Sequence, residues 1–437
     1  MDTTIKSGLG SYLDKGKLFI KAVIIFIMAL FLTIPSFFIT GIINERQSRQ
    51  NEAILNITEK WGGKQMITGP FLSVPYIEHA LNVEGKPILI RGKAYFLPSS
   101  LHTAIKVVPE KRYRGIYQVV VYRAEVTMNG RFDALPWQQL KIPAEDILWN
   151  QASVIYKVSD NQRGVNEDVS LQWNDSSILF TPETAESSIL TDGFTANVPM
   201  TTESVASAHP FSLKFDLNGS EQLLVATAAR ENELAISSAW KAPSFTGVKL
   251  PDYRSVTDSG FEARWKFLNR SIPPVWKNNS YSFETTALGA DFKIPVDGYD
   301  KTMRAVKYAI LCIILTFAAF FLIETIYRRP LHLVHYGLAG LALILFYTLL
   351  LSISEYSNFN VAYLVAGVAT IGLVTWFIGS ILRSGKLSLF VAFVLSVVYA
   401  YIFCIIQLED YALLMGSIGL FMALGVIMYF SRKLSWS

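Results

Sequence analysis

Residues 308–327 read YAILCIILTFAAFFLIETIY and contain one charged side chain, Glu324. A run of about 20 apolar residues is long enough to cross the hydrocarbon core of a bilayer as a helix. Four similar stretches follow, separated by short connections, at Tyr336–Leu351, Ala362–Leu382, Ser388–Gln407 and Tyr411–Phe430. Residues 304–431 are therefore predicted to form a bundle of five transmembrane helices.

An isolated apolar stretch, Ala22–Ile43, lies near the N-terminus and follows Lys15, Lys17 and Lys21. A cleaved signal peptide is the competing interpretation, but this run is longer than an ordinary signal-peptide core and no A-x-A-like cleavage site follows it. We therefore predict a signal-anchor, transmembrane helix 1 over residues 22–43, in which Pro35 introduces a kink. The chain then has six transmembrane helices, with residues 1–21 and 432–437 on the same side of the membrane.

Basic side chains occur in alternate connections between these predicted spans. Two connections and the C-terminal tail are basic, whereas the others carry only acidic side chains; the basic ones hold Arg328 with Arg329, Arg383 with Lys386, and Arg432 with Lys433, and the acidic ones hold Glu355, or Glu409 with Asp410. Because Lys and Arg are retained on the cytoplasmic side, both termini are predicted to be cytoplasmic. Residues 44–303 are then exported to the periplasm.

This long middle region is predicted to be rich in β-strands. The stretches Tyr117–Val126 and Phe211–Leu217 alternate or cluster β-branched and aromatic residues, and Asn129-Gly130 and Asn218-Gly219 are turn signals after them. The pattern favours antiparallel sheets in a β-sandwich-like domain, with a helical segment at Asn51–Trp61 before it. Because a strand and an Asn-Gly pair occur twice, two sub-units remain one of the alternatives.

Composition and cysteine content narrow the class of protein further. The chain of 437 residues is 51% hydrophobic and 17% charged, which is too apolar for an ordinary soluble protein, and its net charge of +4 is not concentrated in a block that would indicate nucleic-acid binding. The exported region contains no cysteine, so its fold is predicted to rely on packing. Cys312 and Cys404 lie in predicted spans, where we expect buried apolar thiols.

Several sequence blocks resemble the signature of the CreD family of bacterial inner-membrane proteins. They occur in matching order along nearly the whole chain and comprise Gly69-Pro-Phe-Leu-Ser-Val-Pro-Tyr, Arg114-Gly-Ile-Tyr, Trp240-Lys-Ala-Pro-Ser-Phe-Thr-Gly, Gly260-Phe-Glu-Ala-Arg-Trp, Leu268-Asn-Arg, Pro295-Val-Asp-Gly-Tyr, Arg304-Ala-Val-Lys-Tyr-Ala-Ile-Leu, Leu315-Thr-Phe-Ala-Ala-Phe-Phe, Leu345-Phe-Tyr-Thr-Leu-Leu-Leu-Ser-Ile-Ser-Glu and Leu408-Glu-Asp-Tyr-Ala-Leu-Leu-Met-Gly-Ser. Two loops depart from the family pattern: His332-Leu-Val-His335-Tyr replaces His-Pro-x-Gln-Tyr, and Pro273-Pro-Val-Trp276 replaces Pro-Gln-x-Trp. The resemblance implies an inner-membrane protein of cell-envelope integrity, linked by regulation to a two-component sensor system and to colicin tolerance. It implies no catalytic mechanism.

Five charged residues are predicted to meet at one membrane surface. With the topology above they lie at the exported ends of neighbouring spans: Arg304, Lys307, Glu355, Glu409 and Asp410. Charges at that depth are stabilised by partners of opposite sign, so we expect Arg304 or Lys307 to pair with one of the three carboxylates. Snorkelling of these side chains to headgroups and water is the alternative.

Three further polar residues lie at the opposite, cytoplasmic boundary. Glu324 is an intramembrane acid one helical turn before Arg328, which favours an i,i+4 ion pair over a proton relay. His332 and His335 share a helical face, but without a further Cys or acidic ligand they make a weak metal site. We therefore predict no metal and no cofactor.

The sequence favours a non-enzymatic protein. It contains no Walker loop, no G-x-S-x-G, no H-E-x-x-H and no Cys cluster, although a Ser-His-Asp set assembled only by folding is not excluded by sequence. The exported domain is predicted to bind, sense or scaffold an envelope component or periplasmic partner in stress response, while the helices contact the lipid bilayer. Trp240, Trp265 and Trp276 are either its recognition surface or, preferably, core residues. A transporter or flippase-like protein for an envelope component is the alternative.

Overall fold

The chain folds into two compact units, which we describe separately. The computed structural model describes residues 20–82, 86–182, 190, 192–277, 281–294, 298–327, 329–408 and 411–431, with only the backbone at positions 412, 413, 420, 423, 426, 427, 430 and 431. A helical unit comprises Met1–Asn51 with Val296–Ser437, and a β unit comprises Glu52–Pro295. The predicted exported region, residues 44–303, is therefore longer than the β unit at both ends.

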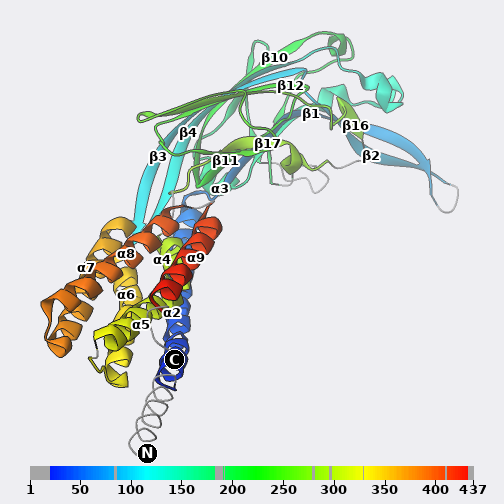
Figure 1. The fold of residues 1–437 in the computed structure, drawn as a ribbon. Coiled ribbons are helices and arrows are strands. Elements are labelled where there is room, and N and C mark those ends of the chain that lie inside the picture. The colour runs from blue at the N-terminus through cyan, green and yellow to red at the C-terminus, as the bar shows by residue number, and fades with distance from the viewer. Residues whose placement is uncertain are drawn as a thin grey trace, which may run out of the picture. The chain divides into compact units, whose positions relative to one another are not determined.

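The helical unit is built mostly from long apolar helices (Figure 1). Its labelled helices are α2 (Ile34–Trp61), which continues into the β unit, α4 (Gly298–Lys307), α5 (Ala309–Tyr327), α6 (Leu333–Ser354), α7 (Phe359–Leu382), α8 (Gly385–Gln407) and α9 (Ala412–Ser431). Residues 20–31 are also helical, and a turn at Leu32 and Thr33 interrupts the helix just before Pro35, where the sequence predicts a kink. Helix α2 includes the helical segment predicted at Asn51–Trp61.

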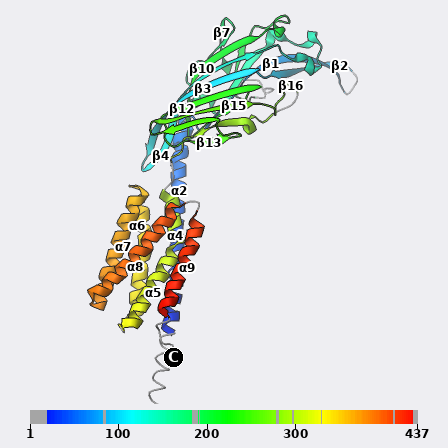
Figure 2. The same cartoon turned by 45° about the horizontal axis from the view of Figure 1, so that its top comes forward.

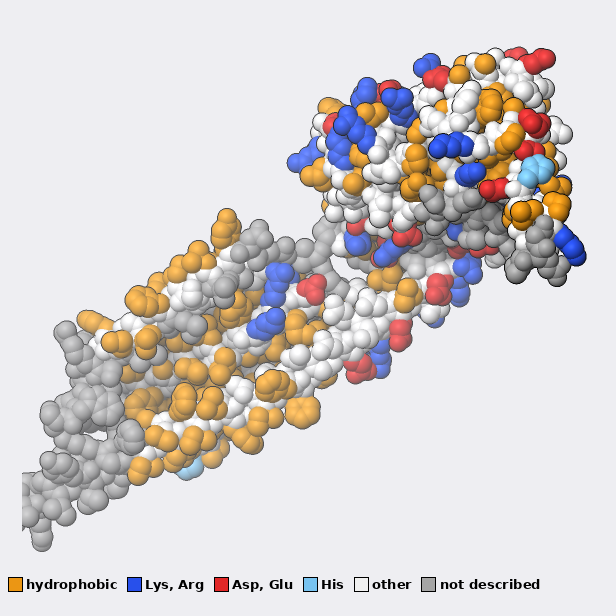
Figure 3. All heavy atoms as spheres, turned by 90° about the vertical axis from the view of Figure 1, so that its right-hand side faces the viewer, with side chains coloured by type: hydrophobic (Ala, Val, Ile, Leu, Met, Phe, Trp, Pro, Cys, Tyr) orange, Lys and Arg blue, Asp and Glu red, His pale blue; other side chains and the backbone are white. Residues whose placement is uncertain are grey.

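Five helices in the described part of the chain are long and apolar enough to cross a membrane. They are Ile20–Trp61, α5, α6, α7 and α8. Their outward side chains are apolar as well as their inward ones; for example, Phe37, Leu364 and Phe393 are all more than half exposed. Figure 3 shows apolar side chains over most of the described helix surface on the face in view, whereas charged side chains gather on the β unit. Such a surface is stable in lipid and not in water.

Two β-sheets form the β unit (Figures 1 and 2). The nine-stranded sheet has the order β13-β17-β11-β1-β5-β9-β8, with β2 also paired to β1 and β16 to β2. Its strands are β1 (Gln65–Leu81), β2 (Pro87–Phe96), β5 (Ser153–Val158), β8 (Thr181–Pro182), β9 (Phe194–Asn197), β11 (Gln222–Ala226), β13 (Ser244–Gly247), β16 (Val275–Lys277) and β17 (Ala287–Asp291).

The eight-stranded sheet has the order β14-β15-β12-β3-β4-β10-β6-β7. Its strands are β3 (Ser100–Arg114), β4 (Tyr117–Phe132), β6 (Ser170–Trp173), β7 (Ser176–Leu179), β10 (His209–Ser220), β12 (Glu231–Ser238), β14 (Tyr253–Thr257) and β15 (Gly260–Leu268). Short helical turns join the strands: η1 (Trp137–Leu140), η2 (Ala144–Asp146), η3 (Trp149–Gln151), α3 (Asn161–Gly164), η4 (Ser204–Ala206) and η5 (Phe283–Thr286).

One hydrophobic core joins the two sheets. Alternating side chains of β10, such as Phe211, Leu213 and Phe215, are buried, and the Phe215 ring lies 5.5 Å from that of Tyr156 in the other sheet. Trp265 and Trp276 are 2% and 4% exposed, so both are core residues, as the sequence favoured. Burying these aromatic side chains gives the β unit its stability without disulfides.

The sheets are not wholly antiparallel, and two predicted turns are wrong. Strands β1 and β11 pair in parallel, as do β3 and β12. Asn129-Gly130 lies inside β4, and Asn218-Gly219 lies inside β10. The chain instead changes sheets at Glu221, which adopts a φ of 57° between β10 and β11. The chain passes there from the eight-stranded sheet to the nine-stranded sheet, in which β11 lies beside β1.

The glycines of these two pairs have a packing role instead. Gly219 is the cross-strand partner of Tyr122, and Gly130 is that of Phe211. A Cβ atom at Gly219 would lie 2.3 Å from the Tyr122 hydroxyl oxygen, and one at Gly130 would lie 2.5 Å from a Phe211 ring carbon. Each glycine therefore makes room for an aromatic ring that crosses from the neighbouring strand.

Candidate functional site

Three consecutive residues at the start of α4 connect the helices of the helical unit. The Tyr299 hydroxyl donates to Glu355 Oε1 at the end of α6 (3.0 Å), and the Lys301 ammonium donates to Gln407 Oε1 at the end of α8 (3.0 Å). Between them, Asp300 accepts a hydrogen bond from Gln47 of α2 at 3.4 Å. We call Tyr299, Asp300 and Lys301 the α4 hub. It begins at the last residue of the Pro295-Val-Asp-Gly-Tyr block of the sequence, and it joins three helices at one end of the unit.

Glu355 is the member of the predicted charge cluster whose partners the structure gives. It caps the C-terminus of α6, and its side chain is only 9% exposed. Its partners are the Tyr299 hydroxyl and Arg46 of α2, whose Nε lies 3.6 Å from Glu355 Oε1. A carboxylate buried to this extent requires such partners. Arg46 was not among the residues predicted from the sequence, although its position after the first apolar stretch was a usable signal.

The described residues do not test the pairing predicted for the remaining members of the cluster. Arg304 and Lys307 lie in the last turn of α4, which ends before α5 begins, and Lys307 is exposed. Glu409 and Asp410 lie outside the described residues. The predicted ion pairs of Arg304 or Lys307 with these acids stay predictions.

Glu324 lies in a second polar cluster, formed with the N-terminal helix. Its Oε1 accepts a short hydrogen bond from Lys21, and its Oε2 accepts one from the Tyr336 hydroxyl of α6 at 3.0 Å. Lys21 also donates to the Leu331 carbonyl at 2.6 Å. The predicted partner, Arg328, lies outside the described residues. The observed pair holds the helix of residues 20–31 against α5, and a proton relay is not needed to explain this acid.

The paired histidines form a helix cap. His332 precedes α6, and its Nδ1 accepts from the Val334 amide at 3.3 Å, while His335 Nδ1 accepts from the His332 amide at 3.2 Å. These bonds satisfy amides at the helix N-terminus that have no partner in the helix itself. In the described parts of the chain no three His, Cys, Asp or Glu side chains cluster as a metal site would require.

The cysteines differ from each other in exposure. Cys312 is buried in α5, as predicted, whereas Cys404 on α8 is exposed, so the prediction of a buried thiol is wrong there. The face of α8 that carries Cys404 is apolar, with Val397 also more than half exposed. A small apolar thiol is compatible with lipid at that position.

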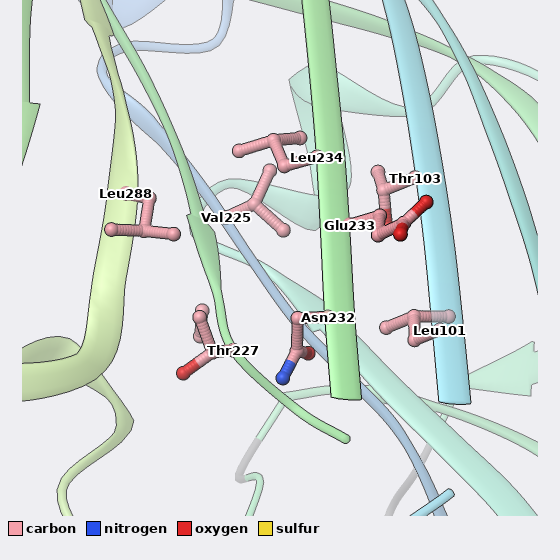
Figure 4. A pocket seen from close by; sticks show the side chains of 9 residues that line it. Leu101, Thr103, Val225, Thr227, Asn232, Glu233, Leu234 and Leu288 are labelled. Carbon is pink, nitrogen blue, oxygen red and sulfur yellow. The ribbon is translucent and has the colours of Figure 1, made fainter. Parts of the chain in front are cut away.

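The interior of the β unit contains a cavity too small for a ligand (Figure 4). Side chains from both sheets line it, including Leu101 of β3, Leu234 of β12, Val225 of β11 and Leu288 of β17. Its volume of about 10 Å³ is at the lower limit for one water molecule. Binding by the β unit at this place would therefore have to use its surface.

The distal half of the β1–β2 hairpin has an open surface with exposed apolar side chains. Its apolar side chains include Leu81, Leu89 and Ile90, which are 70%, 66% and 46% exposed. Strand β1 pairs with β5 up to Ser73 and has one further bridge, from Tyr76 to Ile147, and the described part of β16 pairs with β2 from Ala94 onward. Within the described chain this two-stranded ribbon, which we call the β1–β2 ribbon, thus has exposed backbone edges as well as apolar side chains.

Comparison with known proteins places the chain in a family. The family model described as inner membrane protein CreD matches residues 17–437. The chain belongs to the CreD family. Inner membrane protein CreD of Escherichia coli (strain K12) is 29% identical over 430 residues, which cover 97% of this chain and 94% of that protein. The family membership and the apolar helices together make this CreD-family chain a multi-pass inner-membrane protein.

Similarity to one solved structure is low. A crystal structure from Parabacteroides distasonis ATCC 8503, described as a candidate protease, has a TM-score of 0.23 and 11% identity, covering 55% of this chain and 52% of the other. A TM-score this low supports no statement about the fold or the activity of this CreD-family chain.

Proposed function

We propose that this CreD-family protein maintains the cell envelope by holding an exported binding domain at the inner membrane. The β unit lies in sequence between the membrane-capable helix Ile20–Trp61 and the other membrane-capable helices. Arg329 and Arg383 occur in the α5–α6 and α7–α8 connections and Lys386 in the first turn of α8, whereas the α6–α7 connection carries Glu355. With Lys386 counted as the second residue of α8, at the same end as Arg383, this distribution supports cytoplasmic termini, a sixth span at α9 and a periplasmic β unit.

The observation that carries a binding function is the β1–β2 ribbon. Two-stranded ribbons have marginal stability by themselves, and exposed apolar edges are usually blunted in natural sheets. The ribbon keeps both features, and Leu89 and Ile90 lie on the strand with the open edge. An extended segment of an envelope protein would add a strand along β2 and cover these side chains. The function is then non-enzymatic scaffolding or sensing in the stress response.

The test is restoration of the envelope barrier in cells that lack the protein. Dye uptake and killing by detergent or β-lactam are measured after expression of the wild type, Leu89→Asp or Leu179→Asp. Leu179 is the matched control, because it is 61% exposed on β7 of the other sheet. Wild type and Leu179→Asp should restore the barrier, and Leu89→Asp should not, at equal protein levels and equal thermal unfolding midpoints.

The possible outcomes distinguish an error in the proposed binding surface from an error in the proposed envelope role. Equal restoration by both variants would contradict binding at the β1–β2 ribbon. Absence of any defect in the deleted cells would contradict the envelope role itself and favour the transporter alternative.

A further inference from the structure

A groove in the helical unit lies between α7 and α8, near the α4 hub. It is lined by α7 from Asn360 to Ile371 and by α8 from Ser396 to Phe403, and its volume is about 460 Å³. That volume is within the range of about 300–1,000 Å³ typical of small-molecule sites. Leu364 and Val368 on the rim are 66% and 64% exposed, so the groove opens to the surface of the helix pair.

The length of the groove corresponds to one leaflet of the bilayer. Asn360 follows the first residue of α7, and Ile371 lies near the middle of that helix. With a rise of 1.5 Å per residue, the lining on α7 extends over roughly 16 Å. Half of a hydrocarbon core of about 30 Å is nearly the same length. The groove thus reaches from the end of the helices to about the middle of the membrane.

A lysine lies at the polar end of this groove. The Lys301 ammonium donates to Gln407 Oε1, and its Nζ lies 5.7 Å from the centre of the Phe359 ring. Among the described residues no carboxylate pairs with Lys301. A cation at a membrane boundary whose described partners are an amide and an aromatic face favours an anion beside it.

A series of hydrogen bonds connects Lys301 through Gln407 to Asn360, which lies at the mouth of the groove. Lysine can only donate, so Gln407 Oε1 accepts, and the Gln407 amide nitrogen then donates to Asn360 Oδ1 at 2.7 Å. The Asn360 amide nitrogen is left as a donor. The end of the groove therefore has a positive charge and a further N–H group, both suited to a phosphate oxygen.

We propose that this groove binds an anionic membrane lipid, with one acyl chain between α7 and α8 and its phosphate beside Lys301 and Asn360. The hydrocarbon chain fits the apolar lining and the depth of one leaflet, and the phosphate matches a cation that has no carboxylate partner among the described residues. This inference rests on the inner-membrane location and is independent of the proposed envelope role.

Native mass spectrometry of the full-length protein tests the proposal. Delipidated protein is titrated with phosphatidylglycerol or with zwitterionic phosphatidylethanolamine of the same chains. The wild type should bind phosphatidylglycerol more tightly. Lys301→Gln should weaken phosphatidylglycerol binding about fivefold and leave phosphatidylethanolamine unchanged. Lys386→Gln, at the opposite end of α8, is the charge control and should bind as the wild type does.

Filling the groove tests the acyl-chain site separately. Gly367→Leu should weaken binding of both lipids, because Gly367 lines the groove and a Cβ there has only Tyr399 within 4 Å, at 3.9 Å. Gly372→Leu is the matched control on the same helix, because a Cβ there meets nothing within 4 Å. Ala400→Leu fills the groove from an exposed position on α8. It replaces Gly367→Leu in the test if that variant does not fold.

Three results would overturn the proposal. Equal affinity of the wild type for the two lipids would exclude recognition of the phosphate charge. Wild-type lipid binding by Ala400→Leu and Gly367→Leu would exclude the groove. A changed oligomeric state of these variants with unchanged lipid binding would show that a second copy of the chain occupies it.

Discussion

At the residue scale, aromatic rings that pack over strand positions in the β unit explain why those positions are glycines. The Tyr122 side chain is fully buried, and its hydroxyl donates to the Gln222 carbonyl at 2.7 Å while its ring crosses over Gly219. Burial raises the pKa of the Tyr122 phenol well above its usual value, so the hydroxyl remains a donor. The contact joins β4, β10 and the first residue of β11.

Gly219→Ala should destabilise the protein by about 1–3 kcal/mol, because the added methyl group displaces the Tyr122 ring. In a Tyr122→Ala background the same substitution should cost much less, since the ring is absent. The four proteins of this cycle are compared by thermal unfolding of the full chain. Additive losses would contradict a direct contact between the two residues.

A second prediction concerns an exposed carboxylate in the β14 region. The Lys249 ammonium, 2.5 Å and 2.8 Å from the two oxygens of Asp252, is the main cause of its lowered pKa, and the Lys266 amide adds a hydrogen bond of 2.8 Å. A carboxyl group whose folded pKa is lowered stabilises the fold above its unfolded pKa of about 3.9, and this stabilisation is lost as the pH falls through the lower folded pKa.

Asp252→Asn should therefore lower stability at pH 7 by about 0.5–1 kcal/mol, a small value because the side chain is half exposed. The difference from wild type should shrink as the pH falls below about 3.9. Thermal midpoints across that range measure it, with Asp175→Asn in the β6–β7 turn as control. A difference that does not vary with pH would rule out the carboxylate as its source.

At the scale of elements, most helices could be predicted from sequence, but the side-chain contacts between them could not. The predicted spans from Tyr308 to Gln407 match α5 to α8 to within a few residues at each end, because long apolar runs decide both length and environment. Lys21 and Glu324 are 303 positions apart, and nothing local to either residue indicates the other. Lys21 appeared only as a flanking charge, and Arg46 did not enter the predicted cluster.

The strands show the same limit for a different reason. Alternation in Phe211–Leu217 predicted β10 correctly, since one face of the strand is buried. The Asn-Gly pairs failed as turn signals because a glycine beside an asparagine is equally suited to a strand position that an aromatic ring crosses. Side-chain packing across strands decides between these two roles. The local sequence does not indicate that packing.

The ion pair between Lys21 and Glu324 gives a prediction about helix packing. The two side chains are only 25% and 14% exposed, so Glu324→Gln should lower stability by about 1–3 kcal/mol by removing the carboxylate from Lys21. Replacing both residues by Met should recover most of the loss, since no buried charge is then left alone.

Thermal unfolding of the full-length protein in detergent measures these variants. Glu45→Gln is the matched control, because Glu45 forms an exposed i,i+4 pair with Arg49 on the same N-terminal helix and should contribute little. Equal effects of Glu324→Gln and Glu45→Gln would show that the partly buried pair does not hold the helices together.

At the scale of the whole molecule, the β unit lies in sequence between membrane-capable helices. The central question is therefore on which side of the membrane this unit lies. The proposed envelope role depends on which side of the inner membrane the β unit occupies. The charges in the connections predict the periplasmic side, where the β1–β2 ribbon would meet envelope proteins. The helices would then anchor this domain, with Arg46, Glu355 and the α4 hub at the periplasmic end of the helical unit.

Thiol labelling in intact cells is the most direct measurement of this topology. Ser176→Cys places a thiol at an exposed position of β7, and Ser384→Cys places one in the α7–α8 connection. A maleimide that does not cross the inner membrane should label Ser176→Cys in intact cells, and should label Ser384→Cys only after the cells are opened. The unsubstituted chain, with its buried Cys312 and membrane-facing Cys404, gives the background. Labelling of Ser384→Cys but not Ser176→Cys in intact cells would contradict a periplasmic β unit.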